Sequence, residues 1–499
     1  METIQYLFMG FQTAFTPTNI FVCLVGVLIG TLVGALPGIG PTGAIAILLP
    51  ASYSLGPVPA IILLAGIFYG TQYGGTITSI LMNVPGEASS VVTTLDGYPM
   101  AKQGRAGIAL GIAAIGSFIG GTLSIVGLMT IGPLLADSAL AFGPPEYFSL
   151  MVLALSLVTA FTGKSLVRGL IATIFGLLIG CVGDDVISGD PRLTFGITGL
   201  LDGFQFLPVA VGLFGVSEMI QSLVWKENCD IIKVDLGWRK VLPSWPDMRQ
   251  SLGPILRGSF LGFFVGVLPG AGATIASFLS YGIEQKVSST PERFGKGAIE
   301  GIAGPETANN ASTGGSFIPM LSLGIPGSGT TAVLLGAFLM FGLRPGPNLY
   351  REAPEVVWGL IASMYIGNLI LLVFNIGFIP VMVWIMDKIS PYMRLLVLIL
   401  AVVGVYSFRN ATIDVLIMLT FAVIGIIMKI YEFPISPVVL GLILGDRMEI
   451  SLRQSLAISQ NDLSILFSHP ISAALFMLAI ISFFMPLISK TIGRMRSAD

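Results

Sequence analysis

The sequence predicts an all-α polytopic membrane protein that contains two internal repeats with broken or re-entrant helices. The first observation behind this prediction is the composition: apolar residues make up 54% of the 499 residues and charged residues 10%. Soluble domains carry about 25% charged residues, so most of this surface has to face lipid rather than water. The second observation is a series of long apolar runs, and the third is a glycine and proline motif that occurs twice.

Several apolar runs reach the roughly 20 residues that a bilayer span needs, and together the runs predict roughly 11–14 membrane passes. The long runs cover residues 18–36, 58–82, 107–134, 147–162, 165–183, 205–224, 254–268, 328–343, 355–386, 393–408, 411–430 and 471–489. Shorter runs fit re-entrant or half-spanning segments and lie at 40–50, 271–283, 309–323 and 434–445.

The duplicated motif combines glycines at four-residue spacing with a following Leu-Pro-Gly-x-Gly. The spacing lets two helix backbones come close, and the proline and glycines stop the helix. Two copies of a broken-helix motif in an apolar chain are typical of secondary transporters, whose sites lie where paired helices unwind in mid-membrane. The first copy comprises Gly26, Gly30, Gly34, Leu36, Pro37, Gly38, Gly40, Thr42 and Ala44, and the second Gly258, Gly262, Gly266, Leu268, Pro269, Gly270, Gly272, Thr274 and Ala276.

Two repeats and a linker are therefore expected. Residues 1–225 form the first transmembrane repeat, 226–253 a polar linker that its excess of cations places in the cytoplasm, and 254–499 the second repeat with the C-terminal spans. An inverted arrangement is favoured over a parallel one because it yields alternating access most simply.

The chain ends give an orientation. Residues 1–20 contain no Lys or Arg, and the first apolar run ends without a small-residue cleavage site, which favours an uncleaved first span over a signal peptide. Lys490, Arg494 and Arg496 follow the last span, so the positive-inside rule predicts a cytoplasmic C-terminus and an external N-terminus.

Small hydroxyl residues after a glycine suit a helix N-terminus, where free N–H groups and the helix dipole favour an anion such as a carboxylate. Two such termini at one midplane cavity would hold two carboxyl groups without any arginine. The alternative is that Ser, Thr and Gly here only let helices pack closely. The predicted substrate-binding residues are Gly38, Gly40, Thr42, Gly86, Ser89, Ser90, Gly270, Gly272, Thr274, Gly327, Ser328, Thr330 and Thr331.

Polar residues that precede or follow each Pro-Gly form a second candidate shell, which also includes Gln72 and Glu306. Amide and hydroxyl oxygens beside unwound carbonyl groups would coordinate a hard cation such as Na⁺. Glu87, directly after Pro85-Gly86, would cap its own helix, take up a coupling proton or help to hold a cation. The alternative is that residues 300–313 form an aqueous loop. The predicted coupling-ion residues are Asn83, Glu87, Asn309, Asn310, Ser312 and Thr313.

Other functions lack support in the sequence. A net charge of −2 without blocks of like charge gives no nucleic-acid footprint, and three separated cysteines with a single histidine predict neither a disulfide framework nor a zinc site. Gly38 to Gly43 match a dinucleotide pattern, but they follow a membrane-length apolar run. Gly163-Lys164-Ser165 lacks the first glycine of a phosphate-binding loop, so ATP is not the expected energy source and no cofactor is expected.

Several motifs in order resemble the large membrane subunit of the tripartite tricarboxylate transporters. They are Gly34 to Gly40, Asp96 to Gly104, Gly266 to Gly272, Gly304 to Asn310 and Leu323 to Ser328. The resemblance implies a protein of the bacterial inner membrane that works with a small membrane subunit and a periplasmic solute-binding protein. It implies uptake of a citrate-like di- or tricarboxylate driven by a Na⁺ or H⁺ gradient, and no enzymatic activity.

Two alternatives remain at this point. One is a stand-alone secondary transporter or channel for another small solute, for which no companion subunit would co-purify. The other is a membrane-embedded enzyme acting on a lipid or isoprenoid substrate. Such an enzyme would carry a D-D-x-x-D motif, and Asp184-Asp185 is the nearest approach to one.

Overall fold

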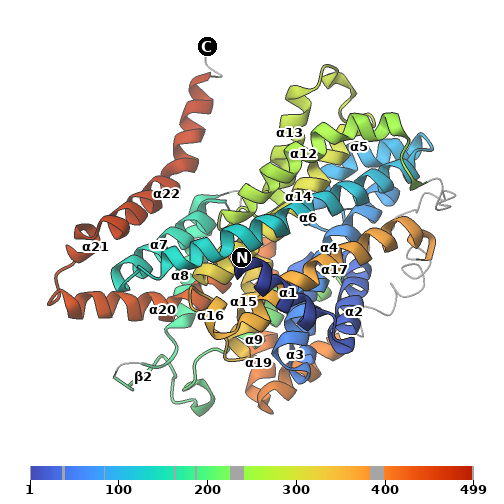
Figure 1. The fold of residues 1–499 in the computed structure, drawn as a ribbon. Coiled ribbons are helices and arrows are strands. Elements are labelled where there is room, and N and C mark those ends of the chain that lie inside the picture. The colour runs from blue at the N-terminus through green and yellow to red at the C-terminus, as the bar shows by residue number, and fades with distance from the viewer. Residues whose placement is uncertain are drawn as a thin grey trace.

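The computed structural model describes residues 2–35, 40–83, 85–161, 165–185, 188–224, 241–381 and 398–496. Within these ranges the chain is almost entirely helical, and the strands are the short pair β1 (Gly183–Asp184) and β2 (Pro191–Arg192). Helices long and apolar enough to cross a membrane are α2 (Pro17–Gly34), α4 (Pro57–Met82), α6 (Ala106–Ala139), α17 (Pro354–Gly377) and α19 (Thr412–Ile430). The prediction of an all-α polytopic membrane protein is confirmed (Figure 1).

The first glycine stripe packs α2 against α4. A side chain on Gly26, Gly30 or Gly34 would collide with a backbone carbonyl oxygen of α4, at residues 63, 67 and 71 respectively. Because the partner residues rise in step with the glycines, the two helices run parallel. The short helix α3 (Gly40–Ser52) lies between them in the chain. Its 13 residues span about 20 Å, less than the hydrocarbon core of a bilayer.

The second stripe makes the same contact between α12 (Trp245–Val267) and α14 (Glu300–Leu323). Side chains on Gly258, Gly262 and Gly266 would overlap carbonyl oxygens of α14 at residues 304, 308 and 312. The intervening helix is α13 (Gly272–Val287). As the motif predicts, α12 stops before Leu268 and a new helix begins at Gly272. Residues 36–39 of the first copy, Gly38 included, lie outside the described residues.

Ion pairs mark the two ends of α6. At its start, Arg105 Nη2 lies 3.0 Å from Asp247 Oδ1 in the first turn of α12. Near its end, Asp137 Oδ1 lies 3.1 Å from Arg351 Nη2 in α16 (Leu349–Glu352). We call these ends of the molecule the α12 face and the α16 face.

The two sets of three helices enter from opposite faces. Helix α1 (Glu2–Ala14), which leads into α2, stacks Tyr6 on Trp358 near the start of α17, with ring centroids 5.7 Å apart. Helix α2 therefore starts at the α16 face, whereas α12 starts at the α12 face. It follows that α4 crosses toward the α12 face and α14 crosses in the opposite direction.

Helix α14 is enclosed by protein along its length. Every residue from Gly301 to Ser322 is buried, with α12, α13, α6 and α5 (Val91–Lys102) around it. The alternative of an aqueous loop at 300–313 is therefore wrong, as is a half-span limited to 309–323. The predicted segment 434–445 likewise belongs to a longer helix, α20 (Ser436–Ile458).

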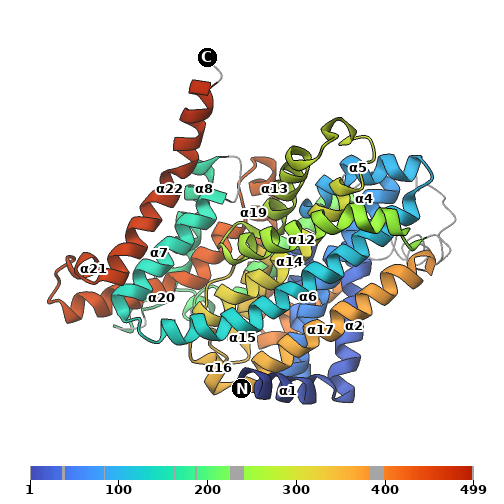
Figure 2. The same cartoon turned by 45° about the horizontal axis from the view of Figure 1, so that its top comes forward.

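A second group of helices lies beside this core, comprising α7 (Pro144–Phe161), α8 (Leu166–Gly180), α20, α21 (Ile465–Ser468) and α22 (Pro470–Arg496). His469 Nδ1 lies 2.9 Å from Glu146 Oε1, which fixes the start of α22 at the α16 face. From there α22 runs toward the end of the molecule at which α5 and α13 finish (Figure 2). The remaining elements are η1 (Tyr53–Leu55), η2 (Ala88–Ser90), η3 (Thr198–Leu200), α9 (Phe206–Ala210), η4 (Val211–Val216), α10 (Ser217–Val224), η5 (Pro291–Arg293) and α15 (Gly329–Met340).

Candidate functional site

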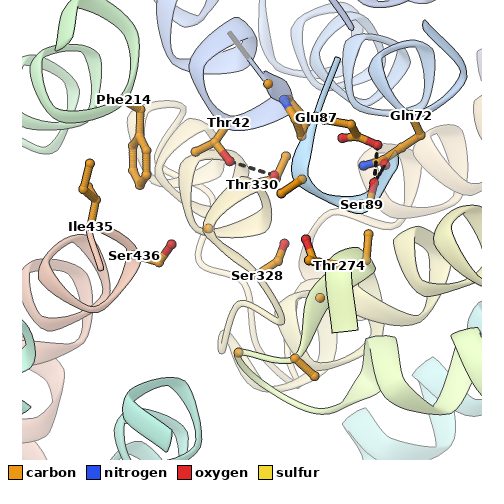
Figure 3. A pocket seen from close by; sticks show the side chains of 18 of the residues that line it. Thr42, Gln72, Glu87, Ser89, Phe214, Thr274, Ser328, Thr330, Ile435 and Ser436 are labelled. Carbon is orange, nitrogen blue, oxygen red and sulfur yellow. Dashed lines mark hydrogen bonds between the residues drawn. The ribbon is translucent and has the colours of Figure 1, made fainter. Parts of the chain in front are cut away.

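A cavity of about 630 Å³ lies where the broken helices of both halves meet. Helices α3, α13, α15 and α20 all begin at residues that line it, and the turn η2 that leads into α5 borders it as well. Figure 3 shows hydroxyl groups of Thr42, Thr274, Ser328, Thr330 and Ser436 around this space. The first N–H groups of a helix have no backbone partner within the helix, so the helix starts give this cavity several positive dipole ends.

Glycines permit the two sharp starts. Gly40 and Gly272, which open α3 and α13, both adopt φ of +60°, and Gly270 adopts +84°. The backbone N–H of Gly270 donates to the carbonyl oxygen of Gly327 at 2.9 Å, so the break before α13 is tied to the break before α15. Residues with a Cβ rarely adopt these angles, which explains why the motif requires glycine there.

Hydroxyl groups join the two halves across the cavity. Thr42 at the start of α3 and Thr330 at the start of α15 share a hydrogen bond of 2.9 Å. The side chain of Ser328 caps α15 by accepting from the N–H of Thr331 at 3.2 Å, and Thr331 Oγ1 accepts from the N–H of Ser328 at 2.8 Å. This reciprocal pair is a capping box, which satisfies the N–H groups of Ser328 and Thr331 locally and fixes the start of α15.

The predicted substrate-binding residues divide into three groups. Those that line the cavity are Gly40, Thr42, Gly86, Ser89, Gly270, Gly272, Thr274, Ser328 and Thr330. Ser90, Gly327 and Thr331 do not line it, because Ser90 and Thr331 cap their own helices and Gly327 packs against Gly266 and Ser316. Gly38 lies outside the described residues.

Two buried carboxylates lie next to one another behind the η2 side of the cavity. Glu306 of α14 is 1% exposed and accepts from Thr76 Oγ1 at 2.7 Å and from Thr93 Oγ1. Glu87 is 8% exposed, borders the cavity and accepts from Ser89 Oγ and from Asn309 Nδ2, the latter at 3.3 Å.

The side chain of Gln72 completes this group. The side chains of Gln72, Glu87 and Ser89 lie close together at this edge of the cavity (Figure 3). With its amide nitrogen turned toward Glu87, Gln72 donates to Oε2 at 3.1 Å, and Ser89 Oγ lies 3.2 Å away. In the part of the chain described here, neither Glu87 nor Glu306 forms an ion pair with a Lys, Arg or His. Burying a carboxylate without a cation is costly, and the hydroxyl and amide donors around Glu87 and Glu306 offset part of that cost.

The predicted coupling-ion residues are only partly assembled here. Asn309 contacts Glu87, and Asn310 Nδ2 donates to Ser117 Oγ at 2.7 Å and to the carbonyl of Glu306 at 3.1 Å. The hydroxyls of Ser312 and Thr313 donate to the carbonyl of Asn309 within α14. Asn83 is exposed and ends α4 with φ of 58°, away from the carboxylate pair.

Several residues that line the cavity were not predicted from the sequence. Lys429 in the last turn of α19 lines the cavity. Among the described residues, no other Lys, Arg or His lines it. The aromatic rings of Phe68 and Phe214 form an apolar part of the cavity wall, and Ser436 is the first residue of α20. A lysine that ends an apolar helix was the available signal, but only the fold brings residue 429 to residues 42 and 330.

Other acidic residues at the ends of apolar runs have structural partners. Asp96 is fully buried, and its Oδ1 accepts from the N–H groups of Gly295, Gly297 and Ala298 at 2.8–2.9 Å. Its Oδ2 accepts from the hydroxyl of Tyr281 at 2.9 Å. Asp96 thus fastens α5 to the turn that precedes α14.

Known proteins resemble this chain over most of its length. The model of the "Tripartite tricarboxylate transporter TctA family" matches residues 20–440. A protein of Agrobacterium vitis named "Uncharacterized 52.8 kDa protein in TAR-I ttuC' 3'region" is 43% identical over 480 residues, which cover 95% of this chain and 94% of that protein. Another from the same organism, "Uncharacterized protein in TAR-II ttuC' 3'region", is 40% identical over 222 residues, or 44% of this chain and 91% of that protein. No solved structure matches the chain significantly.

Proposed function

Because this chain belongs to the tripartite tricarboxylate transporter TctA family, a family of transporters rather than enzymes, we propose that it is the large permease subunit of a binding-protein-dependent importer. Its substrate is a di- or tricarboxylate of the citrate type. The single observation that carries the substrate class is the convergence of four helix N-termini and one capped turn on one cavity. Helix N-termini favour anions, and several at one point suit a ligand with more than one carboxylate.

Lys429 adds a positive charge to the same wall of the cavity. The hydroxyls of Thr42, Thr274, Ser328 and Thr330 supply donors that need no charge of their own. The cavity therefore offers an anion one lysine and many neutral donors. This arrangement binds carboxylates while leaving their identity to the spacing of the donors and to a binding protein.

The coupling ion binds at the carboxylate pair, Glu87 and Glu306. Both groups are buried, and Asn309 lies between them. Carboxylate, amide and hydroxyl oxygens are the ligands that Na⁺ prefers, and the same pair would hold a proton. Since Glu87 also borders the substrate cavity, occupancy of the ion site and of the substrate site is linked through one side chain. Energy comes from a Na⁺ or H⁺ gradient by symport.

The opposite directions of the α2–α3–α4 and α12–α13–α14 sets support an inverted repeat, with residues 226–253 as the linker. The described end of the linker leads into α12 at the α12 face, and α22 ends on the same side (Figure 2). The basic residues of both segments assign this side to the cytoplasm by the positive-inside rule. The α16 face then lies on the periplasmic side of the bacterial inner membrane. A periplasmic solute-binding protein docks there, and a small membrane subunit accompanies the chain.

The test is uptake of labelled citrate and a panel of dicarboxylates into vesicles that contain this chain, its small membrane partner and the binding protein, without ATP. Na⁺ and H⁺ gradients are imposed separately. We expect uptake that collapses when one gradient is removed. Gradient-independent uptake would contradict the coupling, and no uptake of any acid would contradict the substrate class. Equal uptake by the chain alone would favour a stand-alone transporter.

A further inference from the structure

A second cavity of about 390 Å³ lies on the α16 side of the molecule. Its walls are the first turns of α7, the end of α14, the loop from Arg344 to Asn348 and the middle of α20. The charged side chains that line it are Arg344, Arg447 and, at the exposed rim, Glu352. The lining therefore carries a net positive charge.

The two arginines differ from four other arginines of the described chain. Arg192, Arg351, Arg409 and Arg453 each have a carboxylate oxygen within 3.4 Å. Across the described ranges, neither Arg344 nor Arg447 has such a partner or donates a hydrogen bond.

Arg447 is nevertheless half-buried, and it lies close enough to Arg344 for the two positive charges to repel each other. Arg344 is exposed, so the repulsion falls mainly on the half-buried Arg447, and an anion bound between the two guanidinium groups would relieve it. The guanidinium groups are also suited to bidentate recognition of carboxylates.

The second cavity is stacked on the first. Along α7 the second cavity is lined by Leu150 and Met151 and the first by Val158, seven residues or about 10 Å further on. Along α20 the corresponding residues are Leu444 and Leu440, one turn apart.

The broken segment between α14 and α15 separates the two spaces. Gly324 and Ile325 line the second cavity, whereas Ser328 and Gly329 line the first. Only Pro326 and Gly327 lie between these pairs in the chain, so the wall between the cavities is a few residues thick.

We propose that this second cavity is an outer carboxylate site, in which Arg344 and Arg447 receive the di- or tricarboxylate before it passes the Ile325–Gly327 segment to the cavity at the helix starts. This inference rests on the proposed function, and it assigns the carboxylate two successive positions. The arginines raise the local concentration of the anion and speed its capture.

The variants that test it are Arg344→Gln, Arg447→Gln and the double variant. Arg351→Gln is the matched control, because Arg351 lies in the short helix α16 directly after this loop but pairs with Asp137 and does not line the cavity. Initial rates of labelled citrate uptake are measured against citrate concentration at low and high ionic strength. Arg447→Lys keeps the charge, so it and Arg344→Gln remain informative if Arg447→Gln does not fold.

We expect each neutral variant to raise KM at least tenfold with Vmax within twofold of the wild-type value. We also expect the salt dependence of KM to weaken, and Arg447→Lys to restore most of the affinity. A KM within twofold of that of Arg351→Gln would overturn the outer site while leaving the proposed function intact. Absence of carboxylate uptake by the wild-type complex would overturn the proposed function, and with it the ligand assigned to this site.

Discussion

Replacement of Gly270 by alanine tests the geometry of the break before α13. Gly270 has φ of +84°, and a Cβ built there would lie 2.6 Å from Cα of Val158 in α7. The left-handed angle costs about 1–2 kcal/mol for a residue with a Cβ. Carbon atoms in contact prefer separations of about 3.5 Å or more, so α7 has to move by about 1 Å. Such overpacking costs about 1–3 kcal/mol, which brings the total to about 2–5 kcal/mol.

Two other glycines separate these contributions. Gly295 has φ of +81° but open space around its Cβ position, so Gly295→Ala carries the backbone strain alone. Gly282 lies inside α13 with open space and a helical angle, so Gly282→Ala is expected to be neutral or stabilising by up to about 1 kcal/mol. The assay is thermal unfolding of the purified protein in detergent, together with uptake in vesicles.

The expected order of stability is Gly282→Ala, then Gly295→Ala, then Gly270→Ala, with uptake lost only in the last. If Gly270→Ala unfolds at the same temperature as Gly295→Ala, the close approach of α7 to this turn does not exist. Normal uptake by Gly270→Ala would show that the turn has no part in transport.

The remaining predictions concern single side chains. Glu306→Gln keeps the shape of the side chain but removes its charge, so gradient-driven uptake should fall about 100-fold, as expected for loss of a buried ion interaction near 3 kcal/mol; unchanged uptake under both gradients would exclude Glu306 from coupling. Thr330→Val removes the 2.9 Å bond across the cavity and should cost about 1 kcal/mol of stability while raising KM, whereas Thr420→Val on the exposed face of α19 should leave KM unchanged. Lys429→Gln should raise KM for citrate about tenfold without changing which gradient drives uptake; an unaltered KM would remove Lys429 from the site. Asp96→Asn should lower the free energy of unfolding by about 3 kcal/mol, because it disturbs four hydrogen bonds, yet the uptake per folded molecule should stay near the wild-type value.

The fold class and the helix breaks were within reach of the sequence because their causes are local. Glycines at four-residue spacing, such as Gly262 and Gly266, indicate a close helix contact without naming the partner helix, and Pro269-Gly270 stops a helix by its own geometry. The short helices that begin at Gly40 and Gly272 follow from the same residues.

The polar segment at 300–313 shows where local reasoning fails. Its glutamates and asparagines suit a solvated loop as well as a helix, and the choice depends on whether neighbouring helices enclose it. The enclosure comes from α6, α12 and α13, whose glycines and small side chains let α14 come close. Glu306 therefore became a buried partner of Thr76 and Thr93, which no spacing in the sequence indicated.

The sequence predicted the residues of the candidate site that lie at helix starts, but not the other residues that line the cavity. Thr42 and Thr330 each follow a local motif, whereas Lys429 and Phe214 reach the cavity only through the packing of α19 and η4. Ser90 and Thr331 show the opposite error, since residues of the right type can be consumed by capping their own helices.

The enclosure of α14 also bears on how the protein is made. A segment that carries Glu306, Asn309 and Asn310 is poorly suited to partition into lipid on its own, since acidic residues near the centre of an inserting helix cost about 3 kcal/mol each. Its burial on all sides means that α6 and α12 supply the surroundings that lipid does not. Since both of these helices precede α14 in the chain, they leave the ribosome first. Membrane insertion of α14 is then a step of assembly against earlier helices, and deleting α12 while keeping the rest of the chain should prevent α14 from crossing.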